Sequence, residues 1–388
     1  MLTSTIGVRN RLLTVSVTAS LGILTFDNSL AAEEQRMQVR IGGEIQQWMV
    51  IGKQNIETGN GRDLDTSPVD QKYNSEICFS GEAELENGIT VGFRVGLEAN
   101  TDESQIAESY LYFEHPEWGL AQMGDTDNAP TNMHVGAPDG GISVNDGDII
   151  GIEAFVLPEG FKEGNTLIDS TVLQIGDDSS GKFSAFSPRF GGLQIGLSYI
   201  PQFEDGGSDN NSVSLTGNDR PVRDGFAIGL NFTNDFEDVG IEAYAGYLHG
   251  DTASAAGSSN IQGTGAGLVL GFEGFEFGGS FAWANGDMAD DTSIDGMAFD
   301  VGLAYEAATY RIGGTYIRGV SEGSRTDRRN QRLDQAIISG TLFLGPGIDL
   351  VGGLFYYNAN GEKDLVANTG DIESNDGFGF ATGLKLAF

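Results

Sequence analysis

Apolar and polar residues alternate along most of this 388-residue chain, in segments separated by turn residues. In one clear example, Ile89, Val91 and Phe93 share one side of an extended chain, and Thr90 and Gly92 lie between them. A period of two is typical of β-strands, because successive side chains point to opposite faces. The pattern therefore predicts strands that have one apolar face and one polar or glycine-rich face.

Sixteen segments of the chain follow this pattern. Bacterial outer-membrane barrels have an even number of antiparallel strands, and their closure lets every backbone amide find a partner. We therefore expect an all-β protein, a sixteen-stranded antiparallel transmembrane β-barrel. The predicted strands are 37–53, 73–86, 89–100, 105–115, 119–126, 180–190, 193–201, 224–233, 239–250, 262–272, 275–285, 295–305, 309–319, 332–344, 348–358 and 375–388.

The connections between these segments mostly alternate in length. Short links such as 87–88 and 191–192 are interleaved with longer polar ones such as 202–223 and 359–374. Outer-membrane barrels have short turns on one rim and longer loops on the other. Nothing in a secreted, water-soluble β-sandwich would impose this alternation around the whole chain. The connections therefore favour a transmembrane barrel.

Aromatic residues near the predicted strand ends agree with this interpretation. Amphipathic rings favour the two lipid–water interfaces of a barrel. Ordinary aromatic residues of a sheet are the alternative. Trp48, Tyr110, Tyr247 and Tyr356 are among the residues expected at an interface.

The first 32 residues differ from the rest of the chain. Two arginines precede an apolar run over 12–26, and small residues follow it up to Ala31 and Ala32. This order predicts a secretory signal peptide over 1–32, with cleavage after either alanine. The exported barrel domain would be 33–388. No later stretch is apolar over the roughly 18 residues that a membrane helix needs.

The charge of the chain excludes some classes of function. Asp and Glu number 56 and Lys and Arg 21, so that the formal net charge is −35. Nucleic-acid binding through a basic surface is therefore excluded. A solvated acidic surface and attraction of cations both fit, and they are compatible.

No catalytic set emerges from the sequence. Cys78 is the single cysteine, which excludes an internal disulfide and a cysteine metal site. His115, His134 and His249 are far apart in unrelated contexts, so neither a metal triad nor a hydrolase triad can be argued. We do not expect an enzyme.

Four segments resemble the general porins of Gram-negative outer membranes, especially the proteobacterial sixteen-stranded trimeric kind. They are FSGEAELENGITVGFRVGLE at 79–98, EWGLAQMGDTDNAP at 117–130, SPRFGGLQIGLSYI at 187–200 and the terminal GFGFATGLKLAF at 377–388. The resemblance covers residues 37–388. It implies a homotrimeric outer-membrane channel that needs no cofactor, and a terminal Phe388 that the barrel-assembly machinery recognises as its signal.

The longest connection runs over 127–179, and a loop of this length is usually functional or disordered. The resemblance implies that it folds into the barrel and narrows the channel. Its acidic residues would then favour cations, because charges of one sign focus the field in a confined space. For each acid alone, a solvated loop face is the alternative. The candidate constriction acids are Asp127, Asp139, Asp146, Asp148, Glu153, Glu159 and Glu163.

Bases on the faces opposite the apolar rows are candidates for the opposite pore wall. Acids on one side and bases on the other would create a transverse field that orients polar solutes. The alternative for each base is a local ion pair, worth about 0–1 kcal/mol if solvated. The candidate wall bases are Arg40, Arg94, Lys182 and Arg311.

Two positions depart from the pattern of the porins that the chain resembles. Gly124-Asp125 stands where the family often has Gly-Arg, and Ser184 stands where a base is often found. These departures argue against the arginine ladder that the family usually has on the pore wall.

Two further segments leave alternatives open. SRTDRRNQR at 324–332 is the only basic cluster, and in an outer loop it would contact either lipopolysaccharide phosphates or nearby acidic loops. APDGGISVNDGD at 137–148 has closely spaced oxygen ligands that suit Ca²⁺, but it lacks the ligand order and final Glu of an EF-hand. The arginines concerned are Arg325, Arg328, Arg329 and Arg332.

The sequence thus predicts a porin for passive diffusion of small hydrophilic solutes and ions, with a preference for cations. A substrate-specific channel is one alternative, but the predicted inward faces are mainly Gly, Ser, Thr, Ala and charged residues. The alternatives from other classes are a barrel enzyme, an adhesin and a secreted acidic β-sandwich that binds calcium or sugar.

Overall fold

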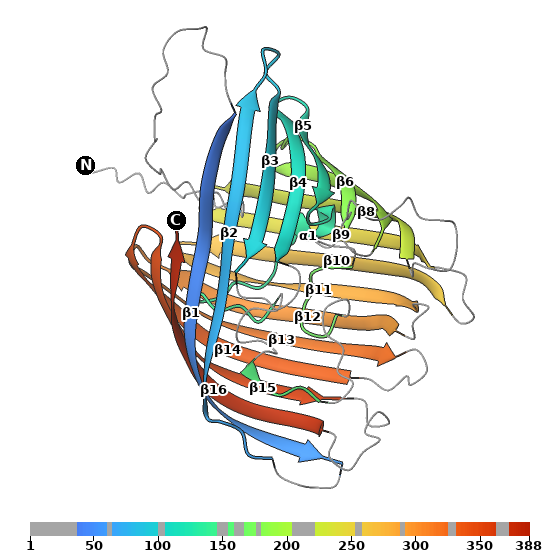
Figure 1. Cartoon of the computed structure of the whole chain (residues 1–388). Coiled ribbons are helices and arrows are strands. Elements are labelled where there is room, and N and C mark those ends of the chain that lie inside the picture. The colour runs from blue at the N-terminus through green and yellow to red at the C-terminus, as the bar shows by residue number, and fades with distance from the viewer. Residues whose placement is uncertain are drawn as a thin grey trace.

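The computed structural model describes residues 37–59, 64–99, 105–145, 154–158, 167–175, 180–203, 222–252, 258–287, 292–324, 331–361 and 372–388. Within these residues, sixteen antiparallel strands form one closed barrel, in which each strand pairs with its neighbours in sequence and β16 pairs with β1 (Figure 1). This confirms the predicted sixteen-stranded barrel.

The strands are longer on average than the alternating pattern suggested, and one short helix follows β5. None of the helices in the described part of the chain is long and apolar enough to cross a membrane. The elements are β1 (Gln38–Thr58), β2 (Val69–Glu84), β3 (Thr90–Glu98), β4 (Ile106–His115), β5 (Gly119–Asp125), α1 (Ala129–Asn132), β6 (Gly181–Phe186), β7 (Leu193–Gln202), β8 (Val222–Phe236), β9 (Val239–Thr252), β10 (Ser259–Phe272), β11 (Phe275–Asp287), β12 (Thr292–Glu306), β13 (Tyr310–Ser324), β14 (Gln331–Gly345), β15 (Ile348–Asn360) and β16 (Ile372–Ala387).

The register places apolar side chains in rows on the outer face. Ile51, Phe380 and Leu354 are direct neighbours across β1, β16 and β15, and all three are exposed. Residues directly opposite each other in an antiparallel pair share one face of the sheet. An exposed apolar face around a closed barrel is the face that meets lipid.

The end of the chain closes the barrel. The Phe388 amide donates to the Gly43 carbonyl, and the Gly43 amide donates to the Phe388 carbonyl, both at 3.0 Å. A side chain at Gly43 would meet the Phe388 ring, since a Cβ there would lie 3.2 Å from the ring. The terminal phenylalanine therefore lies on β1, as expected for the last strand.

Trp48 corrects one expectation. Its indole is only 2% exposed and lies on the inward face, where a Cβ at Gly383 would overlap it. Its Nε1 donates to Gln46 Oε1 at 3.2 Å, and the Lys385 ammonium lies 5.5 Å from its ring centroid. Trp48 is therefore a residue of the inner wall, and the interfacial position expected for it is wrong. Tyr110 is also inward, since it lies opposite Arg94 in the register.

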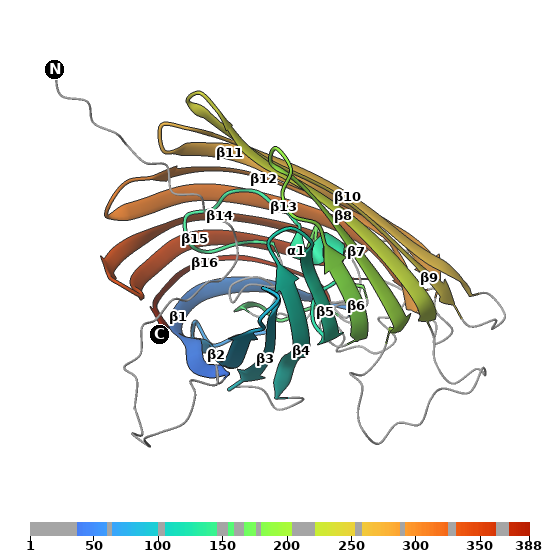
Figure 2. The same cartoon turned by 90° about the horizontal axis from the view of Figure 1, so that it is seen from above.

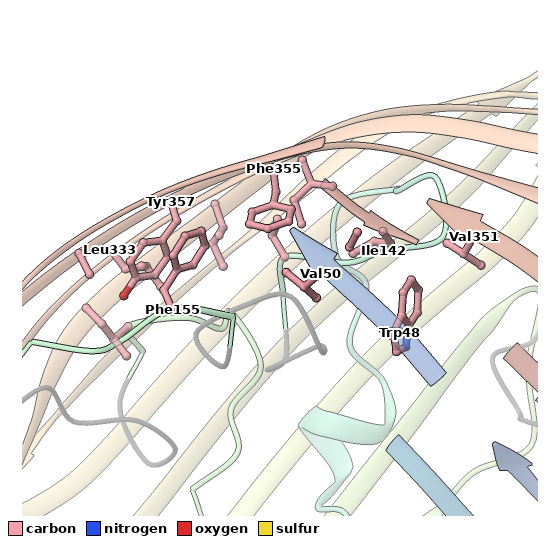
Figure 3. Packing of buried hydrophobic residues seen from close by; sticks show 14 residues of the cluster. Trp48, Val50, Ile142, Phe155, Leu333, Val351, Phe355 and Tyr357 are labelled. Carbon is pink, nitrogen blue, oxygen red and sulfur yellow. The ribbon is translucent and has the colours of Figure 1, made fainter. Parts of the chain in front are cut away.

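The buried apolar residues of the barrel lie where the β5–β6 connection packs on the inner wall. Figure 3 shows Phe155 and Ile142 from this connection beside Tyr357, Phe355 and Val351 of the strands. Phe155 stacks on Tyr357 with centroids 4.4 Å apart. A second cluster combines Leu167, Leu173 and Ile175 of the connection with strand residues. The hydrophobic effect therefore holds this connection against the wall.

Candidate functional site

The β5–β6 connection begins with α1 on the inner face of the barrel (Figure 2). Asn128 caps the helix, since its Oδ1 accepts from the Thr131 amide at 3.1 Å. The Ala129 amide donates to Ser198 Oγ on β7 at 2.9 Å, and Asn231 Nδ2 on β8 donates to the Met133 carbonyl at 3.1 Å. These bonds join both ends of the helix to the wall.

Glycines on the wall let the loop backbone approach closely. A Cβ at Gly267 would lie 1.8 Å from the Val135 carbonyl oxygen, and one at Gly319 would lie 1.9 Å from that of Ile168. No side chain fits at either position, so the loop backbone lies directly on the strands. Close approach of the loop explains part of the glycine content of the inward faces.

The buried carboxylate of Asp300 on β12 is the centre of the polar contacts between loop and wall. It accepts from the Ala137 amide at 3.2 Å, from Asn145 Nδ2 at 2.5 Å and from Ser280 Oγ at 2.8 Å, and it also accepts from the Ser280 amide. Thr171 extends this network, with its Oγ1 2.5 Å from Ser280 Oγ and 2.6 Å from Asn145 Nδ2. The part of the loop that contains Ala137 and Asn145 and the later part that contains Thr171 are thus hydrogen-bonded to the same two neighbouring strands, β11 and β12.

His134 belongs to this network on the loop side. Its Nε2 lies 3.0 Å from Thr171 Oγ1, and its ring meets the Tyr244 ring edge-on at 5.3 Å. Burial lowers the pKa of His134 to about 4, although the charge of nearby Asp300 acts in the opposite direction. The imidazole is therefore neutral at neutral pH.

The far end of the loop reaches the strands that close the barrel. The Val156 amide donates to Gln54 Oε1 on β1 at 3.0 Å, and Asn375 Nδ2 on β16 donates to the Val156 carbonyl at 2.7 Å. From α1 to Val156, the described parts of the loop follow the inner wall from β7 round to β1. The hydrogen bonds and apolar clusters named above, all among the described residues, join the loop to the wall outside β2 to β4.

Two of the candidate constriction acids lie in the described part of the loop. Asp139 Oδ1 accepts from the Gly141 amide at 2.6 Å, and the carboxylate is half-buried. Asp127 is also half-buried, and it lies two residues beyond the end of β5, which pairs with the strand that carries Glu108. The other five, Asp146, Asp148, Glu153, Glu159 and Glu163, lie outside the described residues.

Two of the candidate wall bases lie beneath the loop. Lys182 is 2% exposed, and its ammonium donates to the carbonyls of Thr126 and Ser180. Arg311 donates to the Asp139 carbonyl at 2.6 Å, and its other nitrogens pair with Glu276 and Glu306. Both side chains face inward, as strand parity predicted, and the contacts indicate that they hold the loop in place.

The other two candidate bases lie on the part of the wall that the loop leaves open. Arg40 pairs with Glu82 at 2.9 Å. Arg94 donates through Nε to Glu108, and its Nη2 lies 3.7 Å from Glu76. Strand parity identified both arginines, but the sequence analysis missed the glutamates, although the same parity places them on the inward face.

Cys78 lies within this arginine cluster. Its Sγ lies 2.8 Å from Glu76 Oε1 and 3.2 Å from Arg94 Nη2. Ligand atoms of Glu76, Cys78 and Glu108 all lie within 4.8 Å of one another. The Arg94 guanidinium already neutralises part of this group, so the cluster is better described as a set of ion pairs than as a metal site.

Where the structure describes the segment suggested for Ca²⁺, the oxygens of Asn145 and Ser143 take part in hydrogen bonds within the loop. Asn145 Oδ1 accepts from the Thr171 amide at 2.9 Å and from Ser170 Oγ at 3.1 Å. Ser143 Oγ donates to the Asn145 carbonyl at 3.2 Å. These contacts give the segment a structural role in fixing the loop.

Comparison with solved structures finds the same fold in outer-membrane channels. The outer membrane channel DcaP of Acinetobacter baumannii has a TM-score of 0.58 at 12% identity, over 91% of this chain and 97% of that one. The anion-selective porin from Comamonas acidovorans has a TM-score of 0.56 at 12% identity, over 91% and 100%. OmpT of Vibrio cholerae, in its trimer form, has a TM-score of 0.56 at 11% identity, over 91% and 99%.

Comparison of the sequence itself is more specific. None of the curated proteins matches the chain. The family model described as Gram-negative porin matches residues 18–362, which is most of the chain. Porins are outer-membrane channels and not enzymes, in agreement with a closed barrel that carries an apolar belt and charged inner walls. The chain therefore belongs to the Gram-negative porin family.

Proposed function

We propose that this porin forms a water-filled channel for passive diffusion of small hydrophilic solutes and ions, and that it prefers cations. The observation that carries the preference is the charge of the open wall, where acids outnumber bases. A cation that passes an acidic wall in a narrow channel is stabilised, and an anion is repelled. The inward-facing acids of β1 to β4 are Glu44, Asp70, Glu76, Glu82, Glu84, Glu98, Glu108 and Glu114, and the inward-facing bases are Arg40, Lys72 and Arg94.

The anion-selective porin with the same fold is compatible with this proposal. Selectivity depends on the side chains that line the channel, whereas the likeness at 12% identity concerns the backbone fold. In this chain, Lys182 and Arg311 are engaged beneath the loop. Their charges therefore offset the open acidic wall less than exposed bases would.

In the same proposal, the loop over 127–179 narrows the channel, and its acids add to the cation preference. The contacts of α1, Asp300 and Val156 support a loop that occupies the lumen. Asp127 and Asp139 are the contributors that the structure describes. The assembly would be a homotrimer, as the trimer form of Vibrio cholerae OmpT suggests. The proposal includes export through the signal peptide at 1–32.

Reconstitution in planar bilayers under a KCl gradient tests the proposed function. We expect large stepwise conductances and a reversal potential of the cation-selective sign. A zero or anion-selective potential would overturn the cation preference and leave the channel function standing. A correctly folded, heat-modifiable barrel without conductance would overturn the channel function.

We also propose that Phe388 is the signal that the assembly machinery recognises. The variant Phe388→Ala keeps the backbone bonds to Gly43, so refolding of the purified chain into detergent should be close to wild type. Assembly in cells should instead fall several-fold, measured as heat-modifiable protein in the outer-membrane fraction, and Phe388→Tyr should restore most of it. Equal losses in cells and in detergent would show that the ring acts through barrel closure alone.

A further inference from the structure

Two tyrosines of β4 face the channel on the part of the wall that the loop contacts above leave open. Tyr110 lies opposite Arg94 of β3, and Tyr112 lies opposite the next inward residue, Gly92. Directly opposed residues share one face of a sheet, so both tyrosines are on the inward face with Arg94. The two ring centroids lie 6.5 Å apart, and the ring planes are inclined at 52°. In the contacts described, neither ring holds the loop, and the lipid interface does not explain their position.

The Tyr112 ring crosses the inner surface of β3. A Cβ at Gly92 would lie 2.2 Å from Tyr112 Cζ, so the ring occupies the space that a side chain would take there. The Tyr112 hydroxyl donates to Glu82 Oε2 on β2 at 3.2 Å. The half-buried ring is thus held at both ends, and it covers the glycine with one face and presents the other to the lumen. A group fixed in this way loses little conformational freedom when a solute stacks on it.

Two carboxylates lie next to Tyr112, toward the rim of the short turns. Glu84 of β2 and Glu114 of β4 are both directly opposite Thr90 of β3. Side chains two residues apart on one face of a strand are about 7 Å apart, so Glu114 is within reach of a solute on the Tyr112 ring. Both carboxylates are exposed, and neither has an ion-pair partner among the described residues. They are therefore available to a cation in the channel.

The bases of this wall do not offset its acids. Acids outnumber bases among the inward-facing residues of β1 to β4, and Arg40 and Arg94 are each paired with a glutamate of the same wall. Lys182 lies two strands from Tyr110, but it is buried and its ammonium is bound to two carbonyls. A cation beside the tyrosines is therefore attracted by the wall as a whole.

The basic cluster at 324–332 does not change this balance where the structure describes it. Arg332 is on β14, which is not a neighbour of β4, and its Nε donates to Asp334 Oδ2 at 2.7 Å. Arg325, Arg328 and Arg329 lie outside the described residues.

Ring faces beside carboxylates indicate the kind of solute that this wall recognises. A cation over the face of an aromatic ring is attracted by the ring quadrupole, and quaternary ammonium groups are recognised by aromatic surfaces in this way. Two faces inclined at 52° can contact the same cation while a carboxylate balances its charge. We propose that Tyr110, Tyr112, Glu84 and Glu114, the tyrosine platform, bind organic cations with a substituted ammonium group as they pass through the channel. This inference rests on the proposed cation-preferring channel and names a class of solute for it.

The test measures binding of choline to the folded full-length chain in a deuterated detergent with an uncharged head group. Saturation transfer from the protein to the N-methyl protons of choline reports binding and needs no conductance. We expect saturable binding to wild type. The half-saturating concentration should rise about tenfold in Tyr110→Leu/Tyr112→Leu, because each lost cation–π contact accounts for a factor of about two to five. Tyr110→Phe/Tyr112→Phe keeps both rings and should stay within about twofold of wild type.

Two matched controls separate the platform from general effects. Tyr199→Leu/Tyr247→Leu removes two exposed tyrosines from the lipid faces of β7 and β9 and should bind choline as wild type does. The neutral analogue 3,3-dimethylbutan-1-ol has the shape of choline without its charge and should show no saturable binding. Equal half-saturating concentrations in wild type and the Tyr110/Tyr112 leucine variant would overturn the proposal. Equal binding of the neutral analogue, or an equal loss in the lipid-face control, would also overturn it.

The KCl current in planar bilayers separates this inference from the proposed function. Choline on the tyrosine platform obstructs the current, so the current should fall along a saturable curve in wild type, and the leucine variant should need about tenfold more choline. Conductance without choline binding would overturn the tyrosine platform and leave the channel function standing. Choline binding to a chain that does not conduct would overturn the channel function and leave the binding site.

Discussion

Replacing Asp300 by alanine should detach the middle of the β5–β6 loop from the wall and raise the noise of the open-channel current several-fold. The substitution leaves the Ala137 amide, the Asn145 side chain and the Ser280 donors without their shared acceptor. A buried donor without a partner costs about 1–3 kcal/mol. The loop can recover these bonds from water only by leaving the wall. Single-channel recording at fixed voltage measures the effect.

The barrel itself should survive this change. Its strands are joined by backbone ladders around the whole ring, and in the contacts described the Asp300 side chain accepts one backbone amide of a neighbouring strand, that of Ser280. The heat-modifiable mobility of Asp300→Ala should therefore match wild type. Asp295→Ala is the matched control, since Asp295 is on the same strand and accepts only from Asn285 and Gly286 in the contacts described. If the open-channel current of Asp300→Ala were no noisier than that of wild type, Asp300 would not anchor the loop.

The strands were predictable because a single physical rule governs most of their residues. A wall between lipid and water must alternate side chains with a period of two, and β3 and β4 end within two residues of the predicted bounds. The longest errors are polar extensions of β1 to Thr58 and of β13 to Ser324. In the extension of β1 the outward positions Lys53, Asn55 and Glu57 are polar, so the apolar outer row that marks a strand in the sequence ends while the backbone ladder continues.

The course of the loop could not be read from the sequence. In the sequence, Asp300 resembles the other inward-facing polar residues of the strands. Its partners Ala137 and Asn145 are 163 and 155 residues away along the chain. Strand parity says which face a side chain takes, but not whether another segment covers it. Lys182 illustrates the limit, because its face was predicted and its burial beneath the loop was not.

The position of Trp48 was predicted wrongly for a related reason. Its type suggested the lipid interface, although its place in the alternation of β1, between the outward Ile45 and Ile51, already indicated the inward face. The alternation along the strand therefore indicated the face of Trp48 more reliably than its residue type did. The same reasoning identifies Glu76 and Glu108 as wall residues, since they lie opposite Glu44 and Gly96 on inward positions.

Removing both of these charges with Glu76→Gln/Glu108→Gln should move the reversal potential toward anion selectivity. Arg94 then stays charged beside two neutral amides, so the local charge changes from about −1 to about +1. A unit charge contributes about 1 kcal/mol at 4 Å in water, and about half of that at twice the distance. Two charges therefore raise the energy of a passing cation by about 1 kcal/mol, roughly a fivefold fall in its local concentration.

The opposite change provides the sharpest comparison. Arg94→Gln leaves both carboxylates and should move the reversal potential toward stronger cation selectivity. The reversal potentials of the two variants should therefore shift from the wild-type value in opposite directions. Glu237→Gln/Glu273→Gln removes two charges from short turns outside the lumen and should leave the potential unchanged. The shifts should shrink at high salt, because charges are screened over about 10 Å at 0.1 M. Shifts of the same sign in both wall variants would show that altered packing, and not charge, sets the selectivity at this wall.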